Sequence, residues 1–196
     1  MRTSRLEAFS DGVLAIIITI MVLELHVPEE PTLAALGGSA TGFLTYALSF
    51  VYIGIYWNNH HHMFQVVERV DGAVLWANLH LLFWLSLLPF TTAWMDESHF
   101  AQTPMVIYGV NLLLAAAAYF LLQQAIFRAK GGERLREALG RDQKGRASPL
   151  LYCLGIAAAA LNPWLSMAVF VLVAVMWLVP DRRVERYLDT LDPDGV

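Results

Sequence analysis

The chain has few charged residues and almost no cysteine in its 196 residues. Only 15% of the residues are charged and 57% are hydrophobic, which would leave a soluble domain with too much exposed apolar surface. The composition therefore excludes a soluble globular protein and predicts an integral membrane protein. The single Cys153 excludes an internal disulfide, and we expect it to be a small packing residue within a membrane helix.

Basic residues are absent from one side of the predicted membrane. Apolar segments near the ~20 residues that span a bilayer as a helix occupy residues 6–27, 40–64, 73–95, 104–127, 148–162 and 163–179, and the fifth can borrow residues from the polar stretch before it. If these six helices alternate in direction, all 13 Lys and Arg lie on the side of the two termini. By the positive-inside rule both termini are cytoplasmic. The sequence thus predicts one all-α, multi-pass domain over residues 1–196, in the cell membrane and surrounded by the lipid bilayer.

The first apolar segment has no small-residue cleavage site after it and carries Arg5, Glu7 and Asp11 at its start. We therefore expect it to remain as a helix and not to be removed as a signal peptide. The chain also lacks a nucleotide motif and any nucleophile or metal set of an enzyme. We expect no enzymatic activity, no cofactor and no nucleic-acid partner.

Acidic residues without basic neighbours follow the outward ends of the segments. They are Glu24, Glu29, Glu30, Asp96 and Glu97. An acidic rim would concentrate cations, but the positive-inside rule leaves acids unconstrained, so solvated loop carboxylates explain them equally well.

The first segment begins with a polar cluster, Arg5 with Ser10 and Asp11, which runs into the apolar stretch from Val13 to Leu23. Charged side chains at the start of a lipid-embedded helix are costly unless protein groups bind them, so they mark a candidate functional site. At about 100° per residue, one narrow stripe of the helix holds Gly12, Ile16, Thr19 and Leu23. Ser10 and Asp11 lie off this stripe and would face other helices if the stripe faced a central axis. The wheel alone does not choose that face, because its opposite side is equally apolar.

Polar residues of the second and third segments lie at the same depth as this cluster. They are Trp57, Asn58, Asn59, His60, His61 and His62, followed by Asn78 and His80. The topology predicts a hydrogen-bond network in which Asp11 accepts from His or Arg donors. The network is either structural, clamping the first helix, or proton-sensing through its histidines. Trp57 and His61 share one helix face, whereas His60 and His62 point about 200° apart, which argues against a metal site.

The run of Arg5, Phe9-Ser10-Asp11-Gly12-Val13, Ala15-Ile16, Thr19, Leu23 and Pro28 resembles the first-helix signature of the lysosomal-type potassium channel family, the transmembrane protein 175 group. Further matches are Ser49-Phe50, Trp57 with the histidines, Asn78-Leu79 and Leu88-Pro89-Phe90-Thr91. The resemblance covers the first half of the chain by motif and the whole of it by six-helix topology.

The resemblance implies a potassium-permeable channel whose first helix lines a central four-fold pore, with four copies assembled as a homotetramer for monovalent cations. Ile16 resembles the hydrophobic constriction, Thr19 a hydroxyl layer near which permeant potassium ions would pass, and Leu23 a second apolar layer. The residues that resemble the network anchoring the pore helix are Arg5, Phe9, Ser10, Asp11, Trp57, His61, Asn78 and His80. No carbonyl-type filter motif is present, so selectivity should be modest.

Ordinary roles remain open for several of these residues. The Thr19 hydroxyl can bond back to the Ala15 carbonyl, and Pro89 is expected to kink the third helix for packing. The alternative function is a proton-permeable channel or a secondary transporter that uses Asp11, His61 and His80 as a relay.

Overall fold

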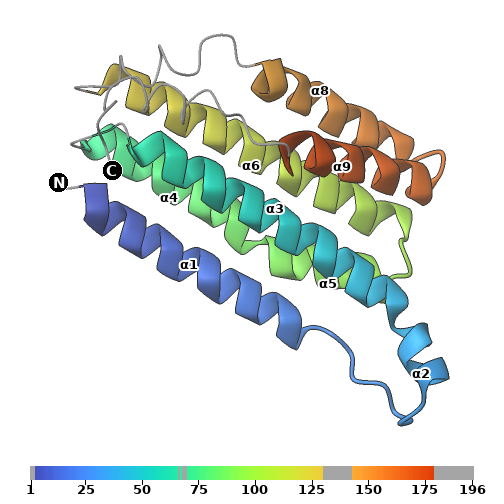
Figure 1. Ribbon diagram of the computed structural model, residues 1–196. Helices are drawn as coiled ribbons and strands as arrows, with labels where there is room; N and C mark the ends of the chain where they lie inside the picture. The colour runs from blue at the N-terminus through green and yellow to red at the C-terminus, as the bar shows by residue number, and fades with distance from the viewer. Residues whose placement is uncertain (1–2, 66, 68–69, 130–142, 179–196) are drawn as a thin grey trace, which may run out of the picture.

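The computed structural model describes residues 3–65, 67, 70–129 and 143–178, and within them it contains helices and no strand. The long helices run alternately in opposite directions along one bundle, and α4 and α5 follow one another in the same direction (Figure 1). Their bounds are α1 Thr3–Leu23, α2 Leu33–Gly38, α3 Ala40–Gln65, α4 Gly72–Ser86, α5 Leu88–Glu97, α6 Gln102–Arg128, α8 Gln143–Ala158 and α9 Pro163–Leu178. The all-α prediction is thus confirmed for this part of the chain.

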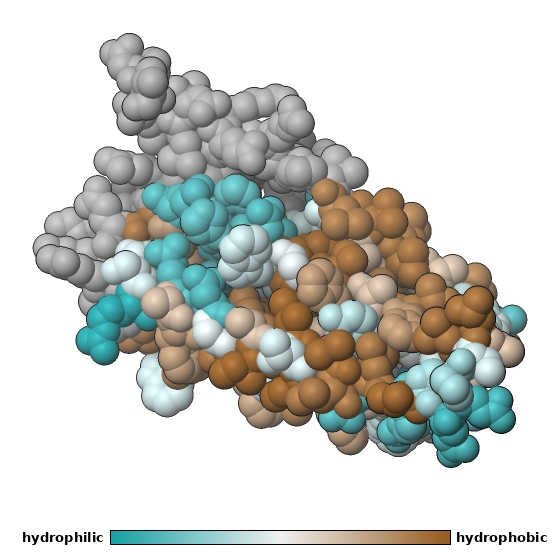
Figure 2. Space-filling view, turned by 60° about the horizontal axis from the view of Figure 1, so that its bottom comes forward, coloured by the Kyte–Doolittle hydropathy of each residue, from teal (hydrophilic) through white to brown (hydrophobic). Residues whose placement is uncertain are grey.

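Four stretches of the described residues are long and apolar enough to cross a membrane: α1, α3, the pair α4 and α5 taken together as Gly72–Glu97, and α6. The helices α8 and α9 have 16 residues each, or about 24 Å at 1.5 Å per residue, which is shorter than a ~30 Å hydrocarbon core. Figure 2 shows apolar residues across the middle of the face that carries α1, with hydrophilic residues toward both ends. This surface suits a membrane-embedded bundle.

The third apolar segment is divided in two. The helix α4 begins at the N-cap Asp71, whose carboxylate accepts the Val74 N–H at 2.9 Å, and it ends at Ser86. A single residue, Leu87, separates it from α5, which has Pro89 in its first turn. Because proline has no N–H to continue the α4 ladder, the break lies where the sequence predicts a kink.

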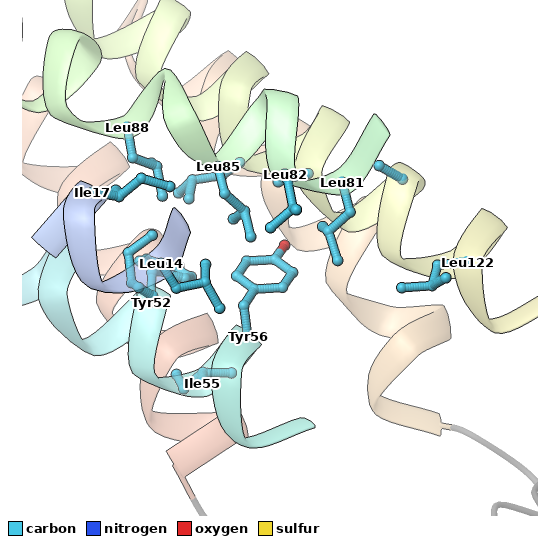
Figure 3. Packing of buried hydrophobic residues seen from close by; sticks show 14 of the residues in the cluster. Leu14, Ile17, Tyr52, Ile55, Tyr56, Leu81, Leu82, Leu85, Leu88 and Leu122 are labelled. Atoms are coloured by element: carbon cyan, nitrogen blue, oxygen red, sulfur yellow. The ribbon is translucent and has the colours of Figure 1, made fainter. Parts of the chain in front are cut away.

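The bundle has two sides. The pore-helix candidate α1 packs on α3, α4 and α5, while α6 packs on α4, α5 and α8, and α9 on α8, α3 and α6. Leu14 and Ile17 of α1 point into the shared core, where they lie among Tyr52, Leu85 and Leu88 (Figure 3). One face of α1 is therefore built into the subunit.

Phe170 of α9 fits between two glycines on the other side of the bundle. A Cβ at Gly109 of α6 would lie 2.6 Å from the Phe170 Cζ atom, and one at Gly155 of α8 would lie 2.5 Å from its Cε1 atom. The Phe170 carbonyl accepts the Tyr52 hydroxyl at 2.6 Å. The ring is fully buried, so the glycines set the spacing of three helices.

We expect Gly155→Ala to destabilise the protein by about 1–3 kcal/mol, because the added methyl overpacks a rigid aromatic contact. The measurement is the midpoint of thermal unfolding of purified protein in detergent. The matched control is Gly54→Ala on α3, where an added Cβ meets nothing within 4 Å. A midpoint equal to that of the control would mean that the Phe170 ring can move to accommodate the added methyl group without loss of stability.

Candidate functional site

The two faces of α1 differ sharply in burial. Leu6, Ser10, Leu14, Ile17 and Met21 are buried against the neighbouring helices. At about 100° per residue this buried face is centred opposite the stripe predicted from the sequence. That stripe faces away from the subunit's own helices: Ile16 is 58% exposed, Leu23 is 80% exposed, and Gly12 and Thr19 are exposed as well. The packing thus selects the face that the helical wheel leaves undecided.

The Thr19 hydroxyl donates to the Ile16 carbonyl at 2.9 Å, three residues earlier, and not to the Ala15 carbonyl. This bond uses the hydroxyl proton only. The lone pairs of the Thr19 oxygen remain available on the exposed face, where they can accept a donor or coordinate a cation.

An open groove runs beside the stripe, between α1 and the α4–α5 break. Its volume is about 620 Å³. Its wall is mainly apolar, with Ile16, Ile20, Phe90 and Trp94 among the lining residues, and Glu24 and Glu97 also line it. The exposed surface around Ile16 is therefore a groove that another apolar helix could fill.

A buried chain of hydrogen bonds ties α1 to α3 and α4. The Asn78 Nδ2 group donates to the Ser10 hydroxyl at 3.0 Å, and Ser10 donates to the Leu6 carbonyl at 2.9 Å. The Asn78 Oδ1 atom lies 2.7 Å from the His60 Nε2 atom. Because the amide oxygen only accepts, His60 must donate from Nε2. Ser10, His60 and Asn78 are each at most 2% exposed, so the chain is shielded from solvent.

A second, more exposed contact holds Asp11. The Trp57 Nε1 group donates to the Asp11 Oδ1 atom at 2.9 Å. The Trp57 ring stacks on His61, with centroids 6.4 Å apart and planes 16° apart. His61 Nδ1 lies 3.8 Å from a carboxylate oxygen of Glu7, and Gln65 donates to its Nε2 at 2.9 Å. We call Ser10, Asp11, Trp57, His60 and Asn78 the anchor.

The start of α1 is fastened as well, since the Thr3 hydroxyl donates to the Val67 carbonyl at 2.7 Å, in the connection between α3 and α4. The anchor and this bond lie toward the same end of α1. The sequence predicts that end to be cytoplasmic.

Some predicted anchoring residues lie outside the anchor. Arg5 is exposed and has no hydrogen bond or ion pair in the part of the chain that the structure describes, and Phe9 is 55% exposed. His80 accepts the Trp84 Nε1 group at 2.9 Å on its own helix, α4, and the structure does not bring it to Asp11. His60, which is not among the anchoring residues that the resemblance implies, lies against Asn78. No sequence signal separates the three adjacent histidines, because burial of one of them depends on how α3 packs on α4.

Within residues 3–65, 67, 70–129 and 143–178, no group of three or more His, Cys, Asp or Glu side chains is placed to hold a metal ion. The candidate site is the exposed apolar stripe with the single Thr19 hydroxyl, on a helix whose opposite face is hydrogen-bonded to α3 and α4.

Known proteins of similar sequence and structure are named as potassium or proton channels. Residues 5–89 match the model of the family described as endosomal/lysosomal potassium channel TMEM175. A protein named potassium channel from Chryseobacterium sp. is 53% identical over 96% of this chain and 98% of its own length. The chicken endosomal/lysosomal proton channel TMEM175 is 32% identical over 65% of this chain and 25% of its own length. The crystal structure of a lysosomal potassium-selective channel TMEM175 homolog from Chamaesiphon minutus is similar with a TM-score of 0.78 and 30% identity, covering 90% of this chain and 96% of that one.

Proposed function

Because this chain belongs to the TMEM175 family of endosomal/lysosomal potassium channels, we propose that it is a potassium-permeable cation channel whose ion path is lined by the exposed stripe of α1. The observation that carries the proposal is the exposure of Ile16, Thr19 and Leu23 on the face opposite the buried one. Exposed apolar side chains on the same helix face as one hydroxyl suit the lining of a pore. Such a pore is enclosed only when several copies of the chain assemble around it.

A homotetramer is the assembly that we propose. One chain supplies a single exposed pore helix, and four such helices around an axis would enclose a path. The apolar groove between α1 and α5 lies next to the stripe, so a neighbouring copy would bury it. Six crossings with both termini in the cytoplasm would agree with the one-sided distribution of the 13 basic residues; α8 and α9 would then be the two short crossings.

Such a pore would control ion passage differently from a selectivity filter built of backbone carbonyls. Four Ile16 side chains would form an apolar neck in which a dehydrated ion has no replacement for its water, so the neck closes by excluding water. Four Thr19 hydroxyl oxygens would offer partial compensation one turn away, and Leu23 would add a second apolar layer. Opening requires the helices to tilt or rotate until a hydrated ion passes.

The test is ion flux into liposomes that contain the purified protein, with potassium, sodium and proton gradients compared. Potassium uptake above that of empty liposomes and faster than sodium uptake supports the proposal. Absence of cation flux from liposomes that contain assembled, folded protein would contradict it.

The Thr19 layer gives a prediction about selectivity. We expect Thr19→Ala to lower the ratio of potassium to sodium flux by about 2- to 5-fold. The substitution removes one weak oxygen ligand per subunit, and we take the free energy lost to be about that of one modest polar interaction. Thr19→Ser is the matched control, since it keeps the hydroxyl and loses only a methyl. Equal ratios for the alanine and serine variants would remove Thr19 from the selective step.

The second candidate function is proton permeation, which the name of the animal relative favours. A relay through Asp11 would need this carboxylate to exchange protons with a histidine. Its hydrogen-bond partner is Trp57 Nε1, an indole donor that neither accepts nor relays a proton at ordinary pH.

The substitution Asp11→Asn separates the two candidates. Asparagine keeps a carbonyl oxygen for the Trp57 donor but cannot carry the carboxylate's proton. The anchor interpretation predicts potassium flux within about 3-fold of the native value, since a charge-assisted bond becomes a neutral one. The relay interpretation predicts that proton flux disappears while the folded assembly persists. Both fluxes are measured in the same liposome preparation.

A further inference from the structure

A separate cavity of about 40 Å³ lies between α3, α6, α8 and α9, and no residue of α1 lines it. Half of its lining residues are aromatic, and they come from all four helices: Tyr52, Tyr56, Tyr119, Phe120, Tyr152 and Trp177. No Asp, Glu, Lys or Arg is among the described lining residues. The wall therefore favours an uncharged occupant with an apolar body.

The amide of Gln123 is the unusual group in this wall. Gln123 is 4% exposed, and it has no hydrogen-bond partner among the residues that the structure describes. An amide without a protein partner on the wall of a cavity can bond to water or to a ligand.

Two other polar side chains of the wall already have hydrogen-bond partners. The Asn59 Nδ2 group donates to the Ile55 carbonyl at 2.8 Å. The Ser148 hydroxyl accepts from Trp177 Nε1 and donates to the Lys144 carbonyl, each at 2.8 Å. Gln123 thus offers both a donor and an acceptor to whatever enters.

We propose that this cavity binds a small neutral amphiphile, a molecule with an apolar body of a few carbon atoms and one hydroxyl or carbonyl group. Its polar end bonds to the Gln123 amide, and its body lies against the rings of Tyr119 and Trp177. One water-sized group needs about 10–15 Å³, so the cavity accepts about three such groups, the size of a short-chain alcohol.

The cavity lies behind the helix that holds the candidate pore helix. Ile55 and Asn59 line it from α3, and the same helix presents Trp57 to Asp11 and His60 to Asn78. An occupant consequently contacts the segment of α3 that carries the anchor, from the side away from α1.

The experiment uses 2-bromoethanol as the probe, because its bromine quenches tryptophan fluorescence and Trp177 is in the wall. Full-length protein in detergent is titrated, and we expect a saturable quenching component in addition to linear collisional quenching. Trp177→Phe should remove the saturable component. Ala116→Leu, which fills the cavity from α6, should also abolish it. Gln123→Leu should weaken the apparent affinity by about 3- to 10-fold, as expected for one lost hydrogen bond.

Two neighbouring residues supply matched controls, because Ala117 is exposed, Gln124 is half-buried, and neither lines the cavity. Ala117→Leu and Gln124→Leu should bind the probe as the native chain does. Purely linear quenching of the native chain overturns the proposal, as does a saturable component that survives Ala116→Leu or an affinity unchanged by Gln123→Leu. If Ala116→Leu does not fold, the Gln123 and Gln124 pair decides alone.

Discussion

Replacing Ile16 by alanine is expected to raise potassium flux on the order of 10-fold, which corresponds to about 1.4 kcal/mol off the barrier to permeation. Ile16 is 58% exposed on the stripe that we propose to line the ion path. In a four-fold assembly the substitution removes three carbon atoms from each of four side chains at the narrowest apolar layer. Water then enters the neck more readily, and the cost of stripping the ion falls.

The measurement is the initial rate of potassium uptake into liposomes, normalised to the amount of assembled protein. Val22→Ala is the matched control, because Val22 is also exposed on α1 but lies about 120° around the helix from Ile16. Its flux should stay near the native rate. If Ile16→Ala and Val22→Ala conduct alike in intact assemblies, α1 does not form the constriction.

The second large effect is expected for Asn78→Leu. Asn78 bridges Ser10 and His60 through hydrogen bonds of 3.0 and 2.7 Å, and all three side chains are buried. Leucine has a similar volume but leaves Ser10 without its donor and the His60 Nε2 proton without its acceptor. We expect a loss of about 1–3 kcal/mol in stability and a parallel fall in potassium flux, since α1 is no longer held in place.

Two readouts check this expectation: the thermal midpoint in detergent and the assembled fraction by size-exclusion chromatography. Asn58→Leu is the control, because Asn58 lies on α3 but takes no part in the anchor. Native stability of Asn78→Leu together with loss of flux would assign Asn78 to conduction itself and remove it from the anchor.

The sequence predicts the family, the helical class and the residues of α1 that share a face. The family resemblance is confirmed by the comparisons, and the break before Pro89 follows from local chemistry that any proline brings. Which face of α1 packs on the other helices could not be predicted from the helical periodicity, because both faces are equally apolar, and only the family resemblance indicated it. Packing against α3, α4 and α5 decides it.

The histidines illustrate the same limit at the level of single residues. The predicted membrane depth placed the three adjacent histidines at the level of Asn78. Successive helical positions differ by about 100°, so only one of them can face Asn78. The orientation of α3 about its own axis decides that it is His60. His80 was assigned to the network by depth, but its side chain bonds to Trp84 one turn along its own helix. The fifth apolar segment was expected to borrow residues from the polar stretch before it, and α8 does begin at Gln143, ahead of the apolar residues.

The hydrogen bonds that tie α1 to its neighbours lie toward one end of the helix, so this end can act as the pivot of a tilting motion. Thr3 and Ser10 hold the end predicted to be cytoplasmic, while the far end continues into the connection to α2. At 1.5 Å per residue, Ile16 lies about 9 Å and Leu23 about 20 Å beyond Ser10. A tilt about that pivot would displace Leu23 about twice as far as Ile16, so in the proposed pore the outer mouth would widen more than the neck, and a distance probe at Leu23 is the more sensitive reporter of motion.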